Sequence, residues 1–368
     1  MTNLPDISTL AILPFFTALV ITLGFTLFSI KIAKRLGLMD DPKLHKHPGI
    51  IHTKPIPRGG GIALFFGPLV ASIFFLPFNN ITFAIFFAAF LALVIGVIDD
   101  KLNAQSKDVS PYLRFLVNIL TAIIVVGSGV AINFITNPFG TGVIQLDAIK
   151  LSLPFLPFSL LLSDIVTVVW LIWVMNMLNW SKGVDGQMPG IVAISAITIG
   201  ILSLTLNTGN QTNNIDAQLS FIIAGAAVGF LFFNFYPAKI FPGYGATALY
   251  LLLGVASILT SAKLATAILV MGVPMVDMIF IIIRRLLNKK SPFQGDKKHL
   301  HHILLKLGYN QRQVALYYWC FSAILGLIAL GLESKSKVFA IIMVIAVTGG
   351  ALLFLHKITK SKNEELIS

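Results

Sequence analysis

Long runs of uncharged, mostly apolar residues recur along this chain, and they constrain its fold more than any other feature. One run covers residues 7–30 and another covers 61–98. About 20 apolar residues are enough to cross the hydrocarbon core of a bilayer as a helix, which satisfies its own backbone hydrogen bonds. Only 11% of the residues are charged, against roughly 25% in soluble domains. We therefore expect an all-α polytopic membrane protein, with residues 1–368 forming a single integral-membrane domain.

The apolar runs divide into about eleven expected spans (ten or eleven), which polar connections separate. They are residues 8–30, 61–77, 81–98, 115–134, 159–177, 190–207, 218–237, 246–261, 264–284, 313–331 and 338–356. Lys and Arg gather in the cytoplasmic loops of membrane proteins. If the amino terminus is outside and the carboxyl terminus cytoplasmic, the inner segments hold 23 of the 27 basic residues. The remaining four are Lys150, Lys263, Lys335 and Lys337. The opposite orientation would reverse this ratio, so we predict this one.

The loop from residue 284 to residue 312 is strongly basic, with eight Lys or Arg and three His. Such a cluster beside a membrane is typical of a site for a phosphate-rich ligand. His299, His301 and His302 have a spacing that could bind zinc, but no Cys or second pair of ligands joins them. Hydrogen bonding to phosphate or sugar oxygens fits the surrounding lysines better. Asp277, inside the preceding span, is a functional or structural polar partner.

A second basic segment precedes the second expected span. Residues 31–58 include His45, His47, His52, Lys54 and Arg58, and three consecutive glycines follow. Lys54 and Arg58 could hold a phosphate at the start of the next helix, where glycines let the backbone approach a ligand. Ordinary anchoring of a cytoplasmic loop would produce the same composition. Both interpretations stay open.

Two adjacent carboxylates, Asp99 and Asp100, lie at the expected inner end of the third span. A pair of this kind is costly to leave unpaired at a membrane edge. It suits a divalent cation, or a base that keeps a phosphate deprotonated. The alternative is a solvated helix end with Lys101 as the partner. Carboxylates at the carboxyl end of a helix oppose its dipole, which counts against that alternative.

Asn176 and Asn179 lie one helical turn apart near the expected inner end of the fifth span, so they share a helix face. A glycine-bracketed turn with Lys182 and Asp185 follows. Two amides and a carboxylate can hold a hard cation or a sugar nucleotide, while a capped helix end is the alternative. Asn234 lies at the inner end of the seventh span, and its surroundings alone indicate only a Pro/Gly turn.

Four segments carry a family resemblance that covers nearly the whole chain. They are IHTKPIPRGGGIA, IGVIDDKLNAQSK, NMLNWSKGVDG and VPMVDMIFIIIRRLLNKKSPFQGDKKHLHHILLKLG. In these segments the chain resembles the polyprenyl-phosphate N-acetylhexosamine-1-phosphate transferases, and its HLHH form is closer to the GlcNAc branch than to the peptidoglycan-precursor branch. The resemblance implies that a lipid phosphate, such as undecaprenyl phosphate, attacks the β-phosphorus of a UDP-sugar. The products would be a lipid diphosphate-sugar for cell-envelope polysaccharides and UMP.

The resemblance also implies a bacterial cell membrane, an active site on its cytoplasmic face and roles for individual residues. Asp99, Asp100 and Asp185 would be catalytic, and Asn179 with Asp185 would hold one Mg²⁺ or Mn²⁺. The implied substrate-binding residues are Lys54, Arg58, Asn176, Lys182, Asn234, His299, His301 and His302. Membrane lipid would surround the protein, two copies could pair, and no nucleic acid is an expected partner.

Two positions depart from the family's pattern. Tyr244 stands where the family has an Asp that binds metal, and Lys182 replaces another Asp. Both changes remove negative charge from the expected cation site, and an ammonium within ~4–6 Å of a metal ion would compete with it. Three possibilities stay open: metal-dependent transfer, direct neutralisation of phosphate by Lys182, or binding of lipid phosphate or nucleotide without turnover.

Overall fold

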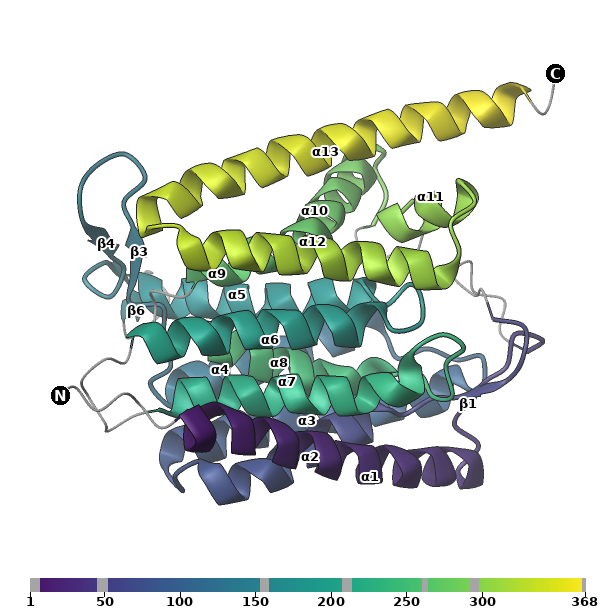
Figure 1. Ribbon diagram of the computed structural model, residues 1–368, viewed down its shortest axis with the longest axis horizontal. Helices are drawn as coiled ribbons and strands as arrows, with labels where there is room; N and C mark the ends of the chain where they lie inside the picture. The colour runs from purple at the N-terminus through teal and green to yellow at the C-terminus, as the bar shows by residue number, and fades with distance from the viewer. Residues whose placement is uncertain are drawn as a thin grey trace.

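The apolar runs form long helices that lie side by side, most of them along the long axis of the molecule (Figure 1). The computed structural model describes residues 7–44, 52–152, 159–206, 214–259, 264–291 and 298–365. His45, His47 and Lys263 lie outside the described residues, as do residues 292–297 of the basic loop.

The first helices begin where local sequence signals favour a helix start. They are α1 (Leu13–Arg35), which continues a short π-helical turn η1 (Ser8–Ile12), α2 (Gly61–Phe75), α3 (Asn80–Asn103) and α4 (Pro111–Gly127). Asn79 caps α3, because its side chain accepts a hydrogen bond from the backbone N–H of Thr82 at 2.9 Å. Pro111 is the first residue of α4, where its missing N–H removes no helical hydrogen bond.

The later helices follow the remaining apolar runs. They are α5 (Leu162–Trp180), α6 (Gln187–Leu206), α7 (Ile215–Asn234), the 3-10 turn η2 (Tyr244–Ala246), α8 (Thr247–Ala256), α9 (Leu264–Val270), α10 (Gly272–Leu287), α11 (Leu300–Lys306), α12 (Gln311–Gly331) and α13 (Ser334–Glu365). A capping box of Asn310 and Gln313 begins α12. The short helix α11 carries two of the three histidines of the basic loop.

Small residues let the inner helices pack closely. Gly225 and Gly229, one turn apart on α7, lie against the backbone of α1, where a Cβ would clash with the carbonyl oxygens of Phe15 and Leu19. Such small residues allow close helix packing inside membranes. Helix α8 contacts α3, α5 and α7, and all of its residues are buried. The site described below lies next to the amino-terminal end of this buried helix.

Among the described residues, seven helices are long and apolar enough to cross a membrane. A further apolar pair, α9 and α10, is bent by 78° at a short break. Three shorter apolar helices cover Gly61–Phe75, Pro111–Gly127 and Tyr244–Ala256. The prediction of a mostly helical, multi-pass membrane protein is therefore confirmed. The count of about eleven spans stays a prediction, because these shorter helices fall below the usual crossing length of about 20 residues.

The expected continuous span 264–284 is two helices instead of one. They meet at Met271, between Val270 and Gly272. Pro274 has no N–H to donate to the carbonyl of Val270, so the helix loses a hydrogen bond at this turn. A break next to a proline is the usual cause of a sharp bend in a helix.

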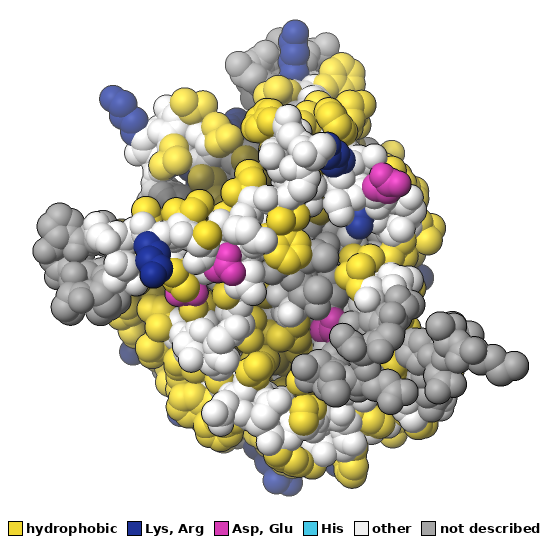
Figure 2. Space-filling model, turned by 90° about the vertical axis from the view of Figure 1, so that its left-hand side faces the viewer, with side chains coloured by type: hydrophobic (Ala, Val, Ile, Leu, Met, Phe, Trp, Pro, Cys, Tyr) yellow, Lys and Arg dark blue, Asp and Glu magenta, His cyan; other side chains and the backbone are white. Residues whose placement is uncertain are grey.

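Three short antiparallel strand pairs occur in two connections of the described chain, and the all-α prediction did not include them. β1 (Met39–Asp40) pairs with β2 (Ile56–Pro57), β3 (Phe134–Thr136) with β4 (Val143–Gln145), and β5 (Lys150–Ser152) with β6 (Ser159–Leu161). The expected span 115–134 therefore extends too far, since α4 ends at Gly127. Figure 2 views the molecule from the end with β3 and β4, where hydrophobic and uncharged side chains cover most of the face and Lys and Arg are scattered.

Candidate active site

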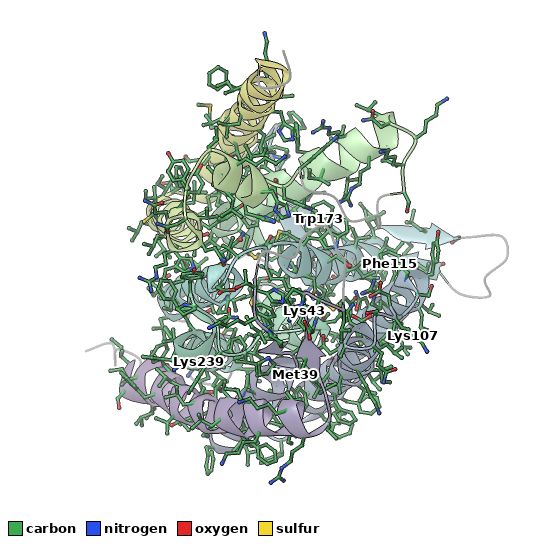
Figure 3. All side chains as sticks on the ribbon, turned by 90° about the vertical axis from the view of Figure 1, so that its right-hand side faces the viewer. Met39, Lys43, Lys107, Phe115, Trp173 and Lys239 are labelled. Carbon is green, nitrogen blue, oxygen red and sulfur yellow. The ribbon has the colours of Figure 1, made fainter. Side chains whose placement is uncertain are left out.

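The polar segments expected on the inner side all lie at one end of the bundle, on the right in Figure 1. They are the described parts of the connections between these helices, residues 36–44, 52–60, 104–110, 181–186, 235–243, 288–291 and 298–310. Figure 3 views the molecule from this end and labels Lys43, Lys107 and Lys239, which belong to three of these connections. Backbone and side-chain hydrogen bonds join the segments, so residues far apart in the sequence form one cluster.

Arg58 links the second segment to the end of α3. Its Nε donates to Asp100 Oδ1 at 3.1 Å, and its Nη1 donates to Asp40 Oδ2 at 3.0 Å and to Asn103 Oδ1. Pairing of β1 with β2 brings Asp40 beside Arg58, since Asp40 lies opposite Ile56 in the register. Asn103 is three residues after Asp100 and therefore shares its helix face. Asp40 and Asn103 were not predicted from the sequence as part of the site.

The two adjacent carboxylates have different surroundings. Asp99 accepts hydrogen bonds from Arg114 Nη1 on both oxygens at 3.2 Å, and from the backbone N–H of Val109 at 3.3 Å. It therefore ties α3 to the start of α4. Asp100 is fully buried, and its Oδ1 accepts from the backbone N–H of Tyr244 at 2.8 Å in addition to Arg58. Its other oxygen, Oδ2, has no hydrogen-bond partner among the described residues.

Glycines hold the segment with Tyr244 against Asp100. Gly243 has a φ of +65°, in the left-handed region that favours glycine, and a Cβ there would clash with Asp100 Oδ2. The next glycine, Gly245, lies between Gly61 of α2 and Gly96 of α3, where a Cβ on either helix would clash with its backbone. The segment is therefore wedged between two helix backbones.

Tyr244 places an aromatic ring where two cations approach. The Arg114 guanidinium lies 5.0 Å from the ring centre and the Lys182 ammonium lies 5.9 Å from it. Contacts of this kind are attractive, because the ring face carries partial negative charge. The Tyr244 hydroxyl accepts a hydrogen bond from Asn118 Nδ2 at 3.3 Å. Tyr244 therefore contributes a neutral ring at the place where the resemblance implied a carboxylate.

Lys182 joins the turn after α5 to the Tyr244 segment. Its Nζ donates to Asn179 Oδ1 at 2.8 Å and to the carbonyl oxygen of Gly243 at 2.6 Å. Asn179 is held in turn by its Nδ2, which donates to Thr247 Oγ1 at 2.7 Å. The pKa of Lys182 is lowered from 10.5 to about 7, mainly by burial and then by the positive charge of Arg58, while nearby carboxylates oppose the change.

Asp185 and Asn234 connect the same turn to the end of α7. Asp185 Oδ2 accepts from the backbone N–H of Ala238 at 2.9 Å. Asn234 Oδ1 accepts from the N–H of Gly186 at 3.1 Å, and its Nδ2 donates to the carbonyl of Ile240 at 2.9 Å. Burial raises the pKa of Asp185, although the Ala238 N–H and the charge of nearby His52 act in the opposite direction.

The three histidines form one wall of the cluster. His299 Nδ1 lies 2.9 Å from Asp277 Oδ2, and Asp277 Oδ1 accepts from the N–H of Leu300 at 2.9 Å. Asp277 therefore positions the start of α11. The ring of His301 stacks on His299 with 5.4 Å between ring centres and lies close to His302.

His301 faces the turn that carries Lys182. Its Nε2 lies so close to Gly183 that a Cβ there would clash with it. The other nitrogen, Nδ1, is buried with no hydrogen-bond partner in the part of the chain that the structure describes. Burial, followed by the neighbouring His302 and His299, lowers the pKa of His301 well below its ordinary value. This imidazole is therefore neutral near pH 7, and one nitrogen can accept a hydrogen bond.

Two residues that the sequence analysis assigned to substrate binding take no part in these contacts. The side chain of Lys54 is exposed. Asn176 is partly buried, and its Nδ2 donates to the carbonyl of Ile172 in its own helix at 2.8 Å. Their roles stay predictions.

Arg114 and Asn118 belong to the cluster, although neither was predicted from the sequence as a site residue. They lie four residues apart on one face of α4, where Arg114 contacts Asp99 and Asn118 contacts Tyr244. The sequence around them carries no recognisable motif.

The family of the chain follows from its relatives. Residues 82–261 match the model of glycosyl transferase family 4. A probable undecaprenyl-phosphate N-acetylglucosaminyl 1-phosphate transferase of Bacillus subtilis (strain 168) is 31% identical over 335 residues, which cover 88% of this chain and 86% of that protein. This chain belongs to glycosyl transferase family 4. The family match includes Asp99, Asp100, Lys182, Asp185 and Tyr244, and the Bacillus protein extends the similarity over most of the chain.

Other family members are similar over comparable lengths. A decaprenyl-phosphate N-acetylglucosaminephosphotransferase of Mycolicibacterium smegmatis is 31% identical over 86% of this chain and 80% of its own length. An undecaprenyl-phosphate alpha-N-acetylglucosaminyl 1-phosphate transferase of Pasteurella multocida is 29% identical over 79% and 77%, respectively. The similarity to the family is therefore not confined to one motif.

The oxygen donors expected to hold Mg²⁺ in this family 4 member already have other partners. Asn179 Oδ1 accepts from the Lys182 ammonium, and Asp185 Oδ2 accepts from a backbone N–H. The described residues contain no group of three or more His, Cys, Asp or Glu side chains arranged to hold a metal ion. Magnesium prefers six oxygen ligands in regular geometry. Among the described residues of the cluster, Asp100 Oδ2 and Asn118 Oδ1 are buried oxygens without a hydrogen-bond partner. They are too few for that ion, so the side chains as placed do not fit it.

Lys182 is expected to make the stability of the protein rise with pH. Its pKa is about 7 in the folded state and 10.5 as a free side chain, so between these values the unfolded chain binds a proton that the folded protein lacks. The free energy of unfolding therefore increases with pH across this window. Thermal melts in detergent should show a rise in Tm that is smaller in Lys182→Gln. Lys107→Gln, which alters an exposed lysine at the same end, should keep the full rise, and equal profiles for all three proteins would contradict the prediction.

Proposed function

We propose that this protein transfers GlcNAc-1-phosphate from UDP-GlcNAc to a polyprenyl phosphate and releases UMP, in the synthesis of a cell-envelope polysaccharide. The relatives described above are named as undecaprenyl- or decaprenyl-phosphate N-acetylglucosamine phosphotransferases, and each is similar over more than three quarters of its length. The structural observation that carries the proposal is the state of Asp100. This buried carboxylate keeps one oxygen without a partner among the described residues, close to the cations Arg58 and Lys182, in a cluster suited to phosphate groups.

In this reaction an oxygen of the lipid phosphate forms a bond to the β-phosphorus of UDP-GlcNAc. The bond between the β-phosphorus and the oxygen bridging to the α-phosphorus breaks, and UMP leaves with that oxygen. Asp100 Oδ2 accepts the proton of the lipid phosphate, which makes its oxygen a better nucleophile. Arg58 and Lys182 neutralise the phosphate oxygens. Phosphoryl transfer depends mainly on such positioning and charge neutralisation.

The histidine wall and the turn with Asp185 would bind the sugar nucleotide. His301 is neutral and has a free buried nitrogen, so it can hydrogen-bond a hydroxyl or amide of the sugar. His299, which Asp277 orients, and His302 lie beside it. Asp185 accepts from the backbone N–H of Ala238, and Asn234 accepts from that of Gly186. These two side chains therefore fix the turn after α5 against the segment after α7. We therefore assign substrate recognition to this side of the cluster and acid–base chemistry to Asp100.

The proposed orientation places this cluster at the cytoplasmic face of the bacterial cell membrane. The seven long helices, the bent pair α9 and α10, and the three shorter apolar helices would then make eleven crossings. The basic connections lie at one end, which the positive-inside rule assigns to the cytoplasm. The amino terminus would be outside, the carboxyl terminus inside, and two copies would pair in the membrane.

Purified protein in detergent tests this activity directly. With undecaprenyl phosphate and UDP-GlcNAc it should release UMP, measured by chromatography of the nucleotides, and omission of either substrate should abolish the signal. Parallel reactions with UDP-GalNAc and UDP-glucose identify the sugar. Absence of UMP release with every sugar, with and without Mg²⁺, would refute transferase activity. Nucleotide binding that persists in the same preparation would instead indicate a binding protein.

Gly183→Ala tests the contact between the Lys182 turn and the histidine wall. The new Cβ would clash with His301 Nε2, so either the ring or the turn must move. We expect a loss of about 1–3 kcal/mol in unfolding free energy, as for other overpacked sites. The UMP release rate should fall by roughly 10- to 100-fold, because a misplacement of about 1 Å in a site can cost 10²-fold in rate. Melting curves and initial rates measure the two effects.

Gly24→Ala is the matched control for this variant. A Cβ at residue 24 has no neighbouring atom within 4 Å, and alanine favours a helix over glycine by about 1 kcal/mol. Its rate should equal that of the wild type and its stability should not fall. Equal behaviour of the two alanine variants would show that the close approach of His301 to Gly183 does not matter for the reaction.

A further inference from the structure

Lys182 differs from the other cations of the cluster in its partners. Arg58 and Arg114 each donate to carboxylates at 3.0 to 3.2 Å. Within the described chain, the ammonium of Lys182 contacts only neutral oxygens, those of the Asn179 side chain and the Gly243 carbonyl. Its charge is therefore not neutralised by a direct ion pair, although it is held in a fixed position.

The two oxygens that hold this ammonium are of a kind that hard cations prefer. Amide and backbone carbonyl oxygens bind such ions, and they also accept hydrogen bonds from an ammonium. Asn179 Oδ1 lies 2.8 Å from Nζ and the Gly243 carbonyl oxygen lies 2.6 Å from it. A divalent ion bound to the same oxygens would have to displace the ammonium, and at any nearby position the two positive charges would repel each other.

The remaining hydrogen-bonding capacity of Lys182 and its charged surroundings favour an anionic ligand. An ammonium has three N–H donors, and only two are used here. Arg58 is the charged group with the largest effect on Lys182, larger than that of Asp100, and it acts by repulsion. Arg58 also has a second terminal nitrogen, Nη2, that donates no hydrogen bond to the residues described. Two fixed cations that repel each other are stabilised when an anion bridges them.

We propose that Lys182 is the built-in cation of this site, and that its ammonium binds the diphosphate of the sugar nucleotide directly, in place of a divalent metal ion. The inference rests on the proposed function and makes it more specific, since it states how the diphosphate is held. The third N–H of Lys182 donates to a diphosphate oxygen, and Arg58 contacts the same group. When the bridging bond breaks, negative charge on the departing UMP phosphate remains next to the ammonium.

Nucleotide binding in the presence and absence of metal tests the proposal. The affinity of purified protein for UDP-GlcNAc is measured by calorimetry in EDTA and in Mg²⁺, followed by UMP release under both conditions. Wild-type protein should bind and turn over in EDTA within about twofold of its values in Mg²⁺. Lys182→Gln should bind roughly 10- to 100-fold more weakly in both buffers, since a hydrogen bond between charged groups is worth about 1.5–3 kcal/mol.

Two further variants separate this role from a structural one. Lys182→Arg keeps the positive charge and should recover part of the affinity that Lys182→Gln loses. Lys107→Gln removes an exposed lysine from the same end of the molecule and should bind as the wild type does. Melting temperatures of all variants identify any that fail to fold. If Lys182→Gln does not fold, the affinity of Lys182→Arg is compared with that of the wild type instead.

Three results would overturn the proposal. Binding or turnover of the wild type that needs Mg²⁺, with a gain of tenfold or more over EDTA, would refute the inference and leave the transferase function intact. If folded Lys182→Gln binds UDP-GlcNAc as tightly as the wild type, the inference is likewise refuted and the transferase function is not affected. A wild type that neither binds UDP-GlcNAc nor releases UMP in either buffer would refute the proposed function and the inference together.

Discussion

Asp100→Asn is expected to lower kcat for UMP release by about 10²- to 10⁴-fold, the usual range for loss of a general base. The substitution keeps the size of the side chain and leaves an oxygen that can accept from Arg58 or from the N–H of Tyr244. It replaces one carboxylate oxygen with an NH₂ group, and the resulting neutral amide cannot accept a proton from the lipid phosphate. KM for UDP-GlcNAc should change much less than kcat, because Asp100 acts on the lipid phosphate in the proposed reaction. Initial rates at varied concentrations of both substrates measure the two constants.

Two matched substitutions sharpen this test. Asp41→Asn changes a carboxylate at the same end that accepts a hydrogen bond from the backbone N–H of Lys43, and it should leave kcat unchanged. Asp99→Asn weakens the connection to Arg114, so its main effect should be on melting temperature. If the Asp99 variant lost more activity than the Asp100 variant at equal folded fraction, the assignment of the base to Asp100 would be wrong.

Arg58→Met is expected to reduce the free energy of unfolding by about 3–5 kcal/mol, as when one partner of a buried ion pair is removed. Asp100 has no exposed side-chain surface and Asp40 has 10%, so both carboxylates would lose their cation in a place that water scarcely reaches. Activity should fall as well, because Arg58 contacts the phosphate in the proposed reaction. Thermal or denaturant unfolding in detergent gives the stability, and nucleotide calorimetry gives the loss of binding.

The double variant Arg58→Met with Asp100→Asn identifies the origin of this loss. If the unpaired carboxylate causes it, the double variant should be more stable than Arg58→Met alone, because the remaining buried group is then neutral. Arg35→Met, at the exposed end of α1, serves as the control and should change stability by less than about 0.5 kcal/mol. Strictly additive effects in the double variant would contradict a direct interaction between Arg58 and Asp100.

The membrane fold was predictable because helices of about 20 apolar residues leave an unmistakable pattern. The details that escaped prediction depend on single residues or on partners distant in the sequence. The break at Met271 follows from Pro274 in an otherwise uniform apolar run. Strand β3 follows α4 with no change in apolar composition, so the expected span continued to residue 134. The orientation and the number of crossings stay predictions.

Much of the site was predictable because its residues have unusual types for a membrane protein. Charged side chains such as Asp100 and Arg58 are rare in apolar surroundings, and the structure joins them by a hydrogen bond. The sequence could not reveal Asp40, since its position depends on strands of two residues each, β1 and β2. Asn103, three residues after Asp100, was detectable from helix periodicity alone. Which residues are catalytic stays a prediction that the variants above address.

The wedging of Gly245 between Gly61 and Gly96 has a consequence for the evolution of this protein. A Cβ added at Gly61 or at Gly96 would collide with main-chain atoms of the segment around Gly245. Main-chain atoms cannot rotate away as side chains do. This side of the candidate site therefore tolerates few substitutions. New sugar preferences, or escape from an inhibitor that fills the site, have to arise on the opposite wall, where histidines and loop side chains set the shape and can be exchanged one at a time.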